Sequence, residues 1–197
     1  MAALPAPASS ALHQGRAASL LKPPDQRLAE LAARAPCFTF HKQSAKDLAL
    51  VALTHSSVTT AKRTNIELAK VGDASGKAAA VKAVFNREDL HTGQDYDRYA
   101  MSRFATKHLA PIARRIGLEE LQRLGRGTSI VSDEMCARAL LALLGVVELT
   151  TGNNAVLRAI TDLGILDLPP VSMQIEVEEQ RYLQPPHQGP DTILAHR

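Results

Sequence analysis

The sequence predicts an all-α fold, and three observations carry that prediction. Apolar residues in the body of the chain recur at spacings of three and four, which is the period of an amphipathic helix. Alternation of apolar and polar residues, which is typical of a half-buried strand, is confined to residues 175–178. Prolines, glycines and N-cap residues divide the body into segments of helical length.

The first two expected helices lie in residues 24–57. Pro24 and Asp25 suit the first turn of a helix, and Pro36 closes the segment that they open. The second helix is expected from about Ala45 to Ser57, because its apolar positions follow helical spacing rather than alternation.

The third expected helix spans residues 65–85 and contains two glycines, Gly72 and Gly76. Its predicted apolar stripe consists of Leu68, Val71, Ala74, Ala78, Val81 and Phe85. A glycine inside a helix costs about 1 kcal/mol relative to alanine. We therefore expect another helix to approach closely at the two glycines.

The C-terminal half of the body predicts a polar loop at residues 86–96 and three further helices. The fourth helix, residues 101–117, includes Pro111, where the missing backbone donor predicts a kink or a break. Ser132 is a good N-cap for the fifth helix, which ends at Gly152. Asn153 and Asn154 are expected to cap the sixth, ahead of two prolines at 169–170.

Composition sets the broad class of the protein. The 197 residues include 23 Lys and Arg against 20 Asp and Glu, a net charge of +3, and 45% apolar residues, which indicates a folded domain at about residues 25–168. Cys37 and Cys136 are too few for a disulfide framework and lack zinc-site spacing, which favours a reducing compartment. No apolar run approaches the roughly 18 residues needed to span a bilayer, so no membrane span is expected.

Both ends of the chain differ from the body. Residues 1–24 are rich in Ala, Ser and Pro, contain Arg16 and Lys22, and precede the first acidic residue, Asp25. This composition suits a mitochondrial targeting segment or an assembly-binding arm, and a disordered tail without an address is the alternative. Residues 169–197 are expected to form a C-terminal arm, in which residues 175–178 are an edge strand or an extended segment.

Four sequence blocks follow one another at consistent spacing. They are ALTHSS at residues 52–57, NIELAKVGDA at 65–74, LAPIARRIGL at 109–118 followed by Leu-Gly-Arg-Gly, and LALLG at 141–145 followed by Thr-Gly and Ala-Val. In this order they resemble the catalytic domain of the ribonuclease III family, whose signature helix has the pattern NERLEFLGDA. The resemblance implies that family's helical endonuclease fold, here with an extension at each end.

The departures from the family pattern concern its chemistry. The family cuts double-stranded RNA with divalent metal ions held by carboxylates, because hard cations need oxygen ligands. The family's acidic positions fall on Ile66, Ala69, Asp73, Arg138 and Leu141, of which only Asp73 is acidic. The resemblance therefore implies an inactive domain with no metal and no cofactor. Cleavage through Asp73 and substitute acids is the alternative, although Asp133 and Glu134 suit the positive end of a helix dipole better.

Two groups of charged residues are candidates for RNA contact. Lys70, Asp73 and Lys77 share one side of the signature helix, either as solvated ion pairs or as direct phosphate ligands. The densest basic group consists of Arg114, Arg115, Arg123 and Arg126. This group suits RNA backbone or protein carboxylates, and a solvated basic face is the alternative.

His55 is a candidate for a Ser/His site because Ser56 and Ser57 follow it. No orienting acid stands out in the sequence, so a structural histidine is the favoured interpretation.

The family resemblance also implies a partner. The signature helix carries the family's dimer interface, so Val71, Gly72, Ala74 and Gly76 are expected to meet a second ribonuclease III-like chain, in a heterodimer rather than a homodimer. The chain resembles most the ribonuclease III-like proteins of the mitochondrial large ribosomal subunit, of the small fungal kind. That likeness implies a structural protein contacting ribosomal RNA and ribosomal proteins. The alternative is an inactive dimerisation subunit of an RNA-processing or RNA-editing complex.

Overall fold

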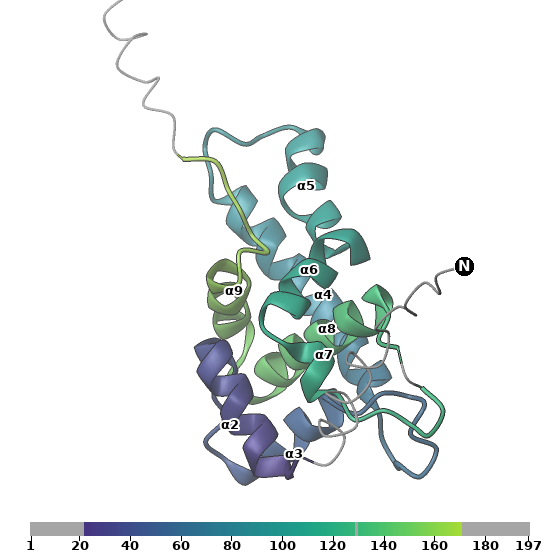
Figure 1. The fold of residues 1–197 in the computed structure, drawn as a ribbon. Helices are drawn as coiled ribbons and strands as arrows, with labels where there is room; N and C mark the ends of the chain where they lie inside the picture. The colour runs from purple at the N-terminus through teal and green to yellow at the C-terminus, as the bar shows by residue number, and fades with distance from the viewer. Residues whose placement is uncertain (1–21, 129, 171–197) are drawn as a thin grey trace, which may run out of the picture.

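The computed structural model describes residues 22–128 and 130–170, and it confirms the all-α prediction over these residues (Figure 1). The helices are α2 (Pro24–Arg34), α3 (Gln43–Ala52), α4 (Asn65–Phe85), α5 (Gly93–Tyr99), α6 (Thr106–Arg115), α7 (Leu118–Leu121), α8 (Asp133–Thr151) and α9 (Asn153–Asp162). Two 3-10 turns, η1 (Pro36–Phe38) and η2 (Met101–Phe104), complete the regular structure. Within the same residues, β-pairing is limited to one isolated bridge.

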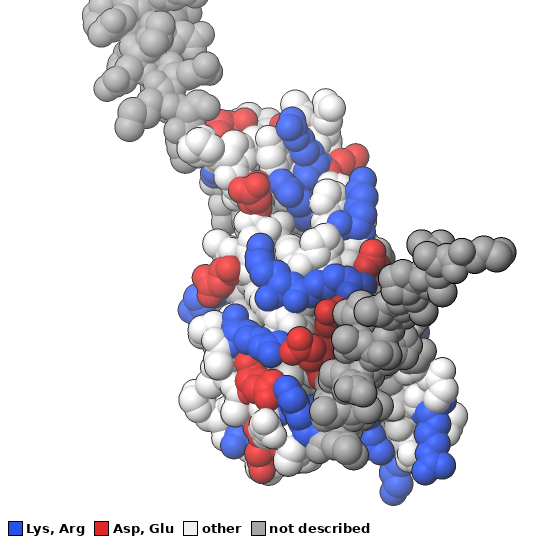
Figure 2. Space-filling view, viewed as in Figure 1, with Lys and Arg blue, Asp and Glu red and all other residues white. Residues whose placement is uncertain are grey.

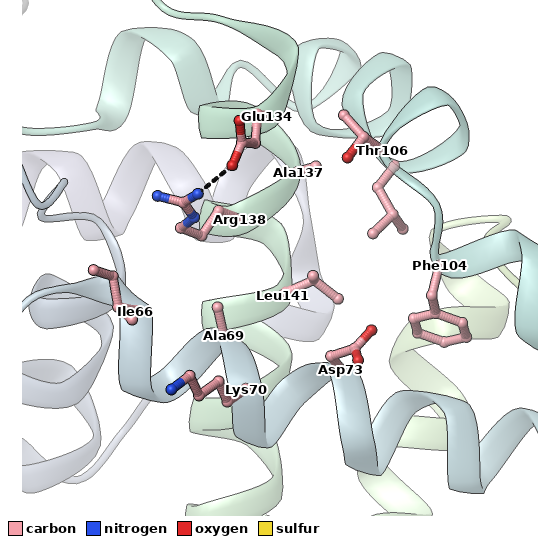
Figure 3. Close-up of a pocket in the computed structure, with 11 residues that line it drawn as sticks. Ile66, Ala69, Lys70, Asp73, Phe104, Thr106, Glu134, Ala137, Arg138 and Leu141 are labelled. Carbon is pink, nitrogen blue, oxygen red and sulfur yellow. Dashed lines mark hydrogen bonds and ion pairs between the residues drawn. The ribbon is translucent and has the colours of Figure 1, made fainter.

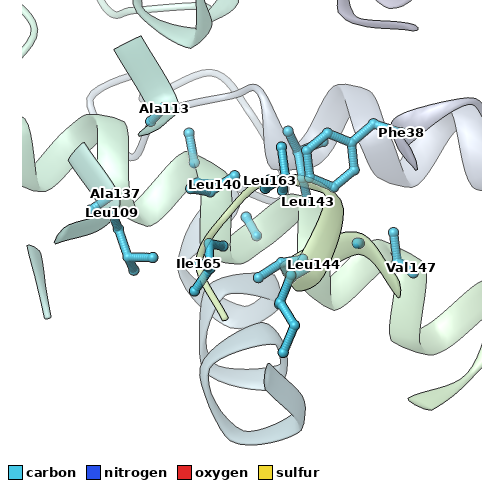
Figure 4. Close-up of a cluster of buried hydrophobic side chains, with 14 of the residues drawn as sticks. Phe38, Leu109, Ala113, Ala137, Leu140, Leu143, Leu144, Val147, Leu163 and Ile165 are labelled. Carbon is cyan, nitrogen blue, oxygen red and sulfur yellow. The ribbon is translucent and has the colours of Figure 1, made fainter. Parts of the chain in front are cut away.

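The centre of the fold is α8, around which α3, α4, α6 and α9 pack. Almost every side chain of α8 from Cys136 to Val147 is buried, so this helix is apolar over most of its surface, as expected of a central helix. Its fully buried leucines, Leu140, Leu143 and Leu144, belong to one cluster with Phe38, Leu163 and Ile165 (Figure 4).

The two longest helices, α4 and α8, make the largest contact in the fold, and glycine permits it. A Cβ atom on Gly72 would lie 1.8 Å from the carbonyl oxygen of Leu141, and one on Gly145 would lie 2.2 Å from that of Leu68. Only glycine allows two helix backbones to come this close. The expected approach of a helix at Gly72 is confirmed, and Gly76 faces the ring of Phe104.

The apolar stripe predicted for α4 is partly wrong. Leu68 is buried, but Ala74 and Ala78 are exposed and Phe85 is 75% exposed. The helix instead turns its glycine face inward, because that face can lie directly on α8.

Residues 86–117 also differ from the prediction. The expected loop contains α5, which begins with a capping box between Thr92 and Asp95. The expected fourth helix is divided at Ala105, an extended residue between η2 and α6. Of the kink or break predicted at Pro111, the break is wrong, since α6 continues through it to Arg115. Pro111 lies on the exposed side of α6, where solvent can bind the carbonyl that loses its helical partner.

Caps at the ends of α8 agree with the sequence. The Ser132 hydroxyl accepts a hydrogen bond from the Met135 N–H at 3.2 Å, and Gly152, with φ of 89°, ends the helix. Asn153, in contrast, does not cap α9. Its side-chain amide donates to the carbonyl of Ser75 instead, which fixes the start of α9 against α4.

The second helix ends earlier than predicted because its C-terminal residues pair with a distant loop. Thr54 and Arg123 form the isolated parallel bridge, in which the Arg123 N–H donates to Leu53 at 2.7 Å and the His55 N–H donates to Arg123 at 3.0 Å. Gly125 lies against Ser57, since its N–H donates to the Ser57 hydroxyl at 2.9 Å. These bonds hold the segments 53–57 and 121–125 together.

Of the predicted extensions at residues 1–24 and 169–197, residues 1–21 and 171–197 lie outside the described residues, and so does the alternating segment at 175–178. Among the helices that are described, none is both long and apolar enough to cross a membrane.

The close contact of α4 with α8 predicts that one methyl group added at Gly72 lowers the stability of the fold strongly. Gly72→Ala should lower the free energy of unfolding by about 2 to 3 kcal/mol, because the new Cβ must push two backbones apart. Gly93→Ala is the matched control, since nothing lies within 4 Å of a Cβ there. Urea denaturation of the full chain compares the two. Equal effects of the two substitutions would contradict the proposed contact.

Candidate functional site

A pocket of about 430 Å³ lies where α4 crosses α8, beside the start of α6 (Figure 3). Each long helix lines it at spacings of three, four and seven, which places the lining residues on one face. From α4 these are Ile66, Ala69, Lys70 and Asp73, and from α8 they are Glu134, Ala137, Arg138 and Leu141. Phe104, Thr106 and Leu109 close the remaining side.

The structure brings together all five positions that the family pattern picks out. Ile66, Ala69, Asp73, Arg138 and Leu141 all line this one pocket. Three of the five are apolar, and Ile66 is 38% exposed. The pocket wall is therefore largely hydrocarbon at the positions where the family pattern has carboxylates.

The acidic groups of the pocket are both paired with cations. Lys77 donates to the Asp73 carboxylate at 2.8 Å, one helical turn along α4. Arg138 donates to the Glu134 carboxylate in the same way on α8 (Figure 3). Lys70 adds a further ammonium to the wall. Each carboxylate thus has its charge balanced within its own helix.

Glu134 is the site residue that the sequence interpretation missed. It was expected to serve only as a dipole partner at the start of α8, yet it lines the pocket. The signal was its spacing, because residues 134, 137, 138 and 141 repeat the intervals of the four lining residues on α4.

A family model described as ribonuclease-III-like matches residues 45–166. The chain belongs to the ribonuclease III-like family. A curated relative, ribonuclease 3 of Caldanaerobacter subterraneus subsp. tengcongensis, is 35% identical over 127 residues, which are 60% of this chain and 55% of that protein. The ribonuclease III-like chain thus spans just over half the length of that relative.

Two solved structures of the nuclease domain of Campylobacter jejuni ribonuclease III share the fold. One aligns with a TM-score of 0.59 at 20% identity, over 69% of this chain and 94% of that domain. The other aligns with a TM-score of 0.54 at 19% identity, over 80% of this chain and 97% of that domain. At these identities the likeness establishes the fold alone.

The residues of the pocket do not fit the metal cluster of the family pattern. Magnesium prefers six oxygen ligands, and a two-metal site needs several carboxylates that bridge or face each other. This ribonuclease III-like pocket offers Asp73 and Glu134, both ion-paired, together with the cations Lys70 and Arg138. Among the residues with described positions, no three His, Cys, Asp or Glu side chains gather closely enough to hold a metal ion.

The four arginines predicted as one basic group have separate roles in the structure. Arg114 binds Glu119 and Asp133, and its hydrogen bond to Asp133 is the main reason that its pKa is raised. Arg115 donates to the carbonyl of Leu163 at 2.6 Å. Figure 2 shows acidic atoms interleaved with basic ones across the middle of this face. Arg114 and Arg115 therefore hold the fold together, while Arg123 and Arg126 stay exposed.

The predicted dimer interface needs a correction at its glycines. Gly72 and Gly76 are buried inside the chain, against α8 and Phe104, so they cannot meet a partner. Ala74 is exposed and Val71 is half-buried, and both remain predicted contacts.

His55 holds the loop beside the pocket. Its Nδ1 accepts a hydrogen bond from the Ser57 N–H at 3.1 Å and lies 3.0 Å from the Ser57 hydroxyl. An Nδ1 that accepts from a backbone N–H belongs to a neutral imidazole. Burial lowers the pKa of His55, and the nearby positive charge of Arg138 lowers it further.

This lowered pKa predicts acid sensitivity. The folded chain binds a proton at His55 less readily than the unfolded chain does, so stability present above pH 6.5, the ordinary histidine pKa, is lost as the pH falls through the folded-state pKa. We expect urea denaturation to show this loss and His55→Asn, which keeps an acceptor for Ser57, to reduce it. The control, His41→Asn at an exposed site, should keep the wild-type profile. An NMR titration of His55 with a midpoint above 6.5 would contradict the prediction.

Proposed function

We propose that the chain is a catalytically inactive ribonuclease III-like subunit that serves as a structural component of the mitochondrial large ribosomal subunit, paired with a related ribonuclease III-like chain. The observation that carries the proposal is the pocket between α4 and α8. Its carboxylate positions hold Ile66, Ala69, Arg138 and Leu141, and its two acids are bound to cations.

The chemistry of that pocket supports loss of cleavage. Metal-assisted hydrolysis needs ions that activate a water molecule and stabilise the leaving oxygen. A guanidinium at Arg138 repels such an ion, and the methyl groups of Ile66, Ala69 and Leu141 offer it no ligand. Freeing Asp73 or Glu134 for a metal would also break an existing ion pair.

The exposed side of α4 supports pairing with another chain. Ala74, Ala78 and Phe85 follow one another at spacings of four and seven, so they share a face, and all three are exposed. Phe85 is 75% exposed, so a partner packed on this face would remove a large apolar side chain from water. One Campylobacter jejuni nuclease-domain structure is described as flexible in a region involved in dimer formation.

The ribosomal and mitochondrial parts of the proposal rest on the sequence. Residues 1–24 carry Arg16 and Lys22 and no acidic residue, a composition that suits organellar import. The net charge of +3 suits a neighbour rich in phosphate. The resemblance to small fungal ribonuclease III-like ribosomal proteins supports the assignment to the large ribosomal subunit.

A cleavage assay tests the catalytic part. The purified full chain, incubated with double-stranded RNA and magnesium, should produce no more cleavage than its Asp73→Asn variant, because neither can assemble the metal cluster. An active ribonuclease III in the same buffer is the positive control. Magnesium-dependent cleavage that disappears in Asp73→Asn would overturn the proposal.

Sedimentation of the tagged chain from its native cell tests the assembly part. We expect it to travel with the mitochondrial large ribosomal subunit and a second ribonuclease III-like chain. Phe85→Asp should release that second chain, because it places a charge in an apolar interface. Ile130→Asp, also at a 75% exposed position, is the matched control and should sediment as the wild type does.

Two results would count against the assembly part. Recovery of the chain in a lighter particle with nucleases or RNA-modifying enzymes would favour the RNA-processing subunit instead. Equal behaviour of Phe85→Asp and wild type would exclude the exposed face of α4 as the partner surface.

A further inference from the structure

A second pocket, of about 380 Å³, opens between α2, the end of α3 and the loop that leads to α4. Its polar wall is cationic, since Arg27, Lys62, Arg63 and Arg123 all line it and none of the described lining residues is acidic. At the lower right of Figure 2, basic atoms of this end of the molecule appear without acidic neighbours. We call these four residues and their cavity the basic pocket.

Backbone pairing explains why these four residues meet. The bridge between Thr54 and Arg123 brings the segment that follows α7 to the end of α3. Arg27, on the first turns of α2, donates to the carbonyl of Leu121 at 3.3 Å, which holds α2 against the same segment. Lys62 and Arg63 follow in the loop before α4.

Arg27 is buried, and no carboxylate of the described residues pairs with it. The residue is only 8% exposed, yet its Nε has no hydrogen-bond partner among the described residues, and the Leu121 carbonyl is the only acceptor found for its guanidinium there. A buried charge is costly unless an opposite charge or several hydrogen bonds compensate it. Burial lowers the pKa of Arg27, and the positive charge of Arg123 lowers it further. Within residues 22–128 and 130–170, this guanidinium therefore has no anionic partner.

The other three cations of the basic pocket are exposed and carry no ion pair within the described part of the chain. This distinguishes them from Lys77, Arg114 and Arg138, each of which has a carboxylate partner. Four like charges around one cavity repel one another unless an anion lies between them.

We propose that the basic pocket binds the phosphate backbone of RNA, with Arg27 at one phosphate and Lys62, Arg63 and Arg123 along its neighbours. Guanidinium groups match phosphate oxygens in a bidentate geometry, and three of the four cations are arginines. A polyanion with regularly repeated charges can satisfy several of them together. The proposal deepens the proposed function and rests on it for the choice of RNA.

The apolar residues of the wall include Leu50 and Val51, which are only partly exposed, so the described part of the pocket offers no strongly exposed apolar anchor and favours RNA over an acidic protein. Protein interfaces depend on aromatic or aliphatic anchors, whereas phosphate contacts predominate in nucleic-acid interfaces. The exposed large apolar side chains of the described residues, Ile66, Phe85, Met101, Ile130 and Leu149, all lie outside the basic pocket.

The test is binding of labelled duplex RNA by the full chain, measured by fluorescence anisotropy between about 50 and 200 mM salt. The pocket variant is Lys62→Gln/Arg63→Gln/Arg123→Gln, which changes exposed side chains only. Each phosphate contact adds almost one unit to the slope of log affinity against log salt, so the variant should lose about two to three units. Its affinity at low salt should fall by about one to two orders of magnitude.

The control is Lys82→Gln/Arg158→Gln/Lys107→Gln, which removes three exposed cations outside the basic pocket and should bind within about threefold of wild type. Equal weakening of both variants, or no binding by wild type, would overturn the proposal.

Inorganic phosphate and polyglutamate are the competing probes. Tight binding of phosphate without RNA binding would assign the pocket to a free anion. Stronger competition by polyglutamate than by phosphate would assign it to an acidic protein. Either result would overturn the proposal that the pocket binds RNA.

These outcomes are separate from those of the proposed function. Cleavage activity, or absence from the ribosomal subunit, would contradict the proposed function while leaving a selective loss of RNA binding in the pocket variant. Correct sedimentation together with unchanged RNA binding in that variant would contradict the basic pocket alone.

Discussion

The backbones of α4 and α8 touch where Gly72 and Gly145 lie against carbonyl oxygens of the opposite helix. This contact sets the distance between the two longest helices, and most other helices pack against one of them. It also determines the pocket, because eight of its lining residues come in two sets of four from these helices. The geometry of the site is therefore a consequence of two glycines that carry no chemistry of their own.

The packed pair of helices α4 and α8 can carry different charged side chains without a change in its backbone geometry. The intervals of three, four and seven on α4 and α8 fix where side chains meet, whatever those side chains are. In this chain the ion pairs run along each helix, from Asp73 to Lys77 and from Glu134 to Arg138, rather than across the pocket to a shared ion. Fold and activity are separable in this sense, and the proposed structural role uses the fold alone.

Sequence reasoning succeeded where the evidence was local or carried by a motif. The bounds of α4, the N-cap at Ser132 and the C-terminal glycine of α8 follow from residues beside each boundary. Ile66, Ala69, Asp73, Arg138 and Leu141 could be placed in one site only because the family pattern links the two helices. The buried face of α4 was misjudged because hydrophobicity favours Phe85 over glycine, whereas helix contact favours glycine.

The basic pocket could not be predicted from the sequence, because its members are brought together by tertiary pairing. Arg27, Lys62 and Arg123 belong to three separate segments that meet through the bridge at Thr54 and the bond from Arg27 to Leu121. The linear density of Arg114, Arg115, Arg123 and Arg126 suggested a different group, two of whose members bind groups within the fold.

Metal binding at the pocket between α4 and α8 tests the central claim most directly. Titration of the full chain with Mn²⁺, followed by electron paramagnetic resonance, counts bound ions without requiring any RNA substrate. Loss of the carboxylate cluster predicts no saturable binding in the millimolar range, with identical titrations for wild type and Asp73→Asn. Binding of Mn²⁺ by wild type that Asp73→Asn abolishes would show that the pocket still assembles a metal site, and it would contradict the inactive assignment.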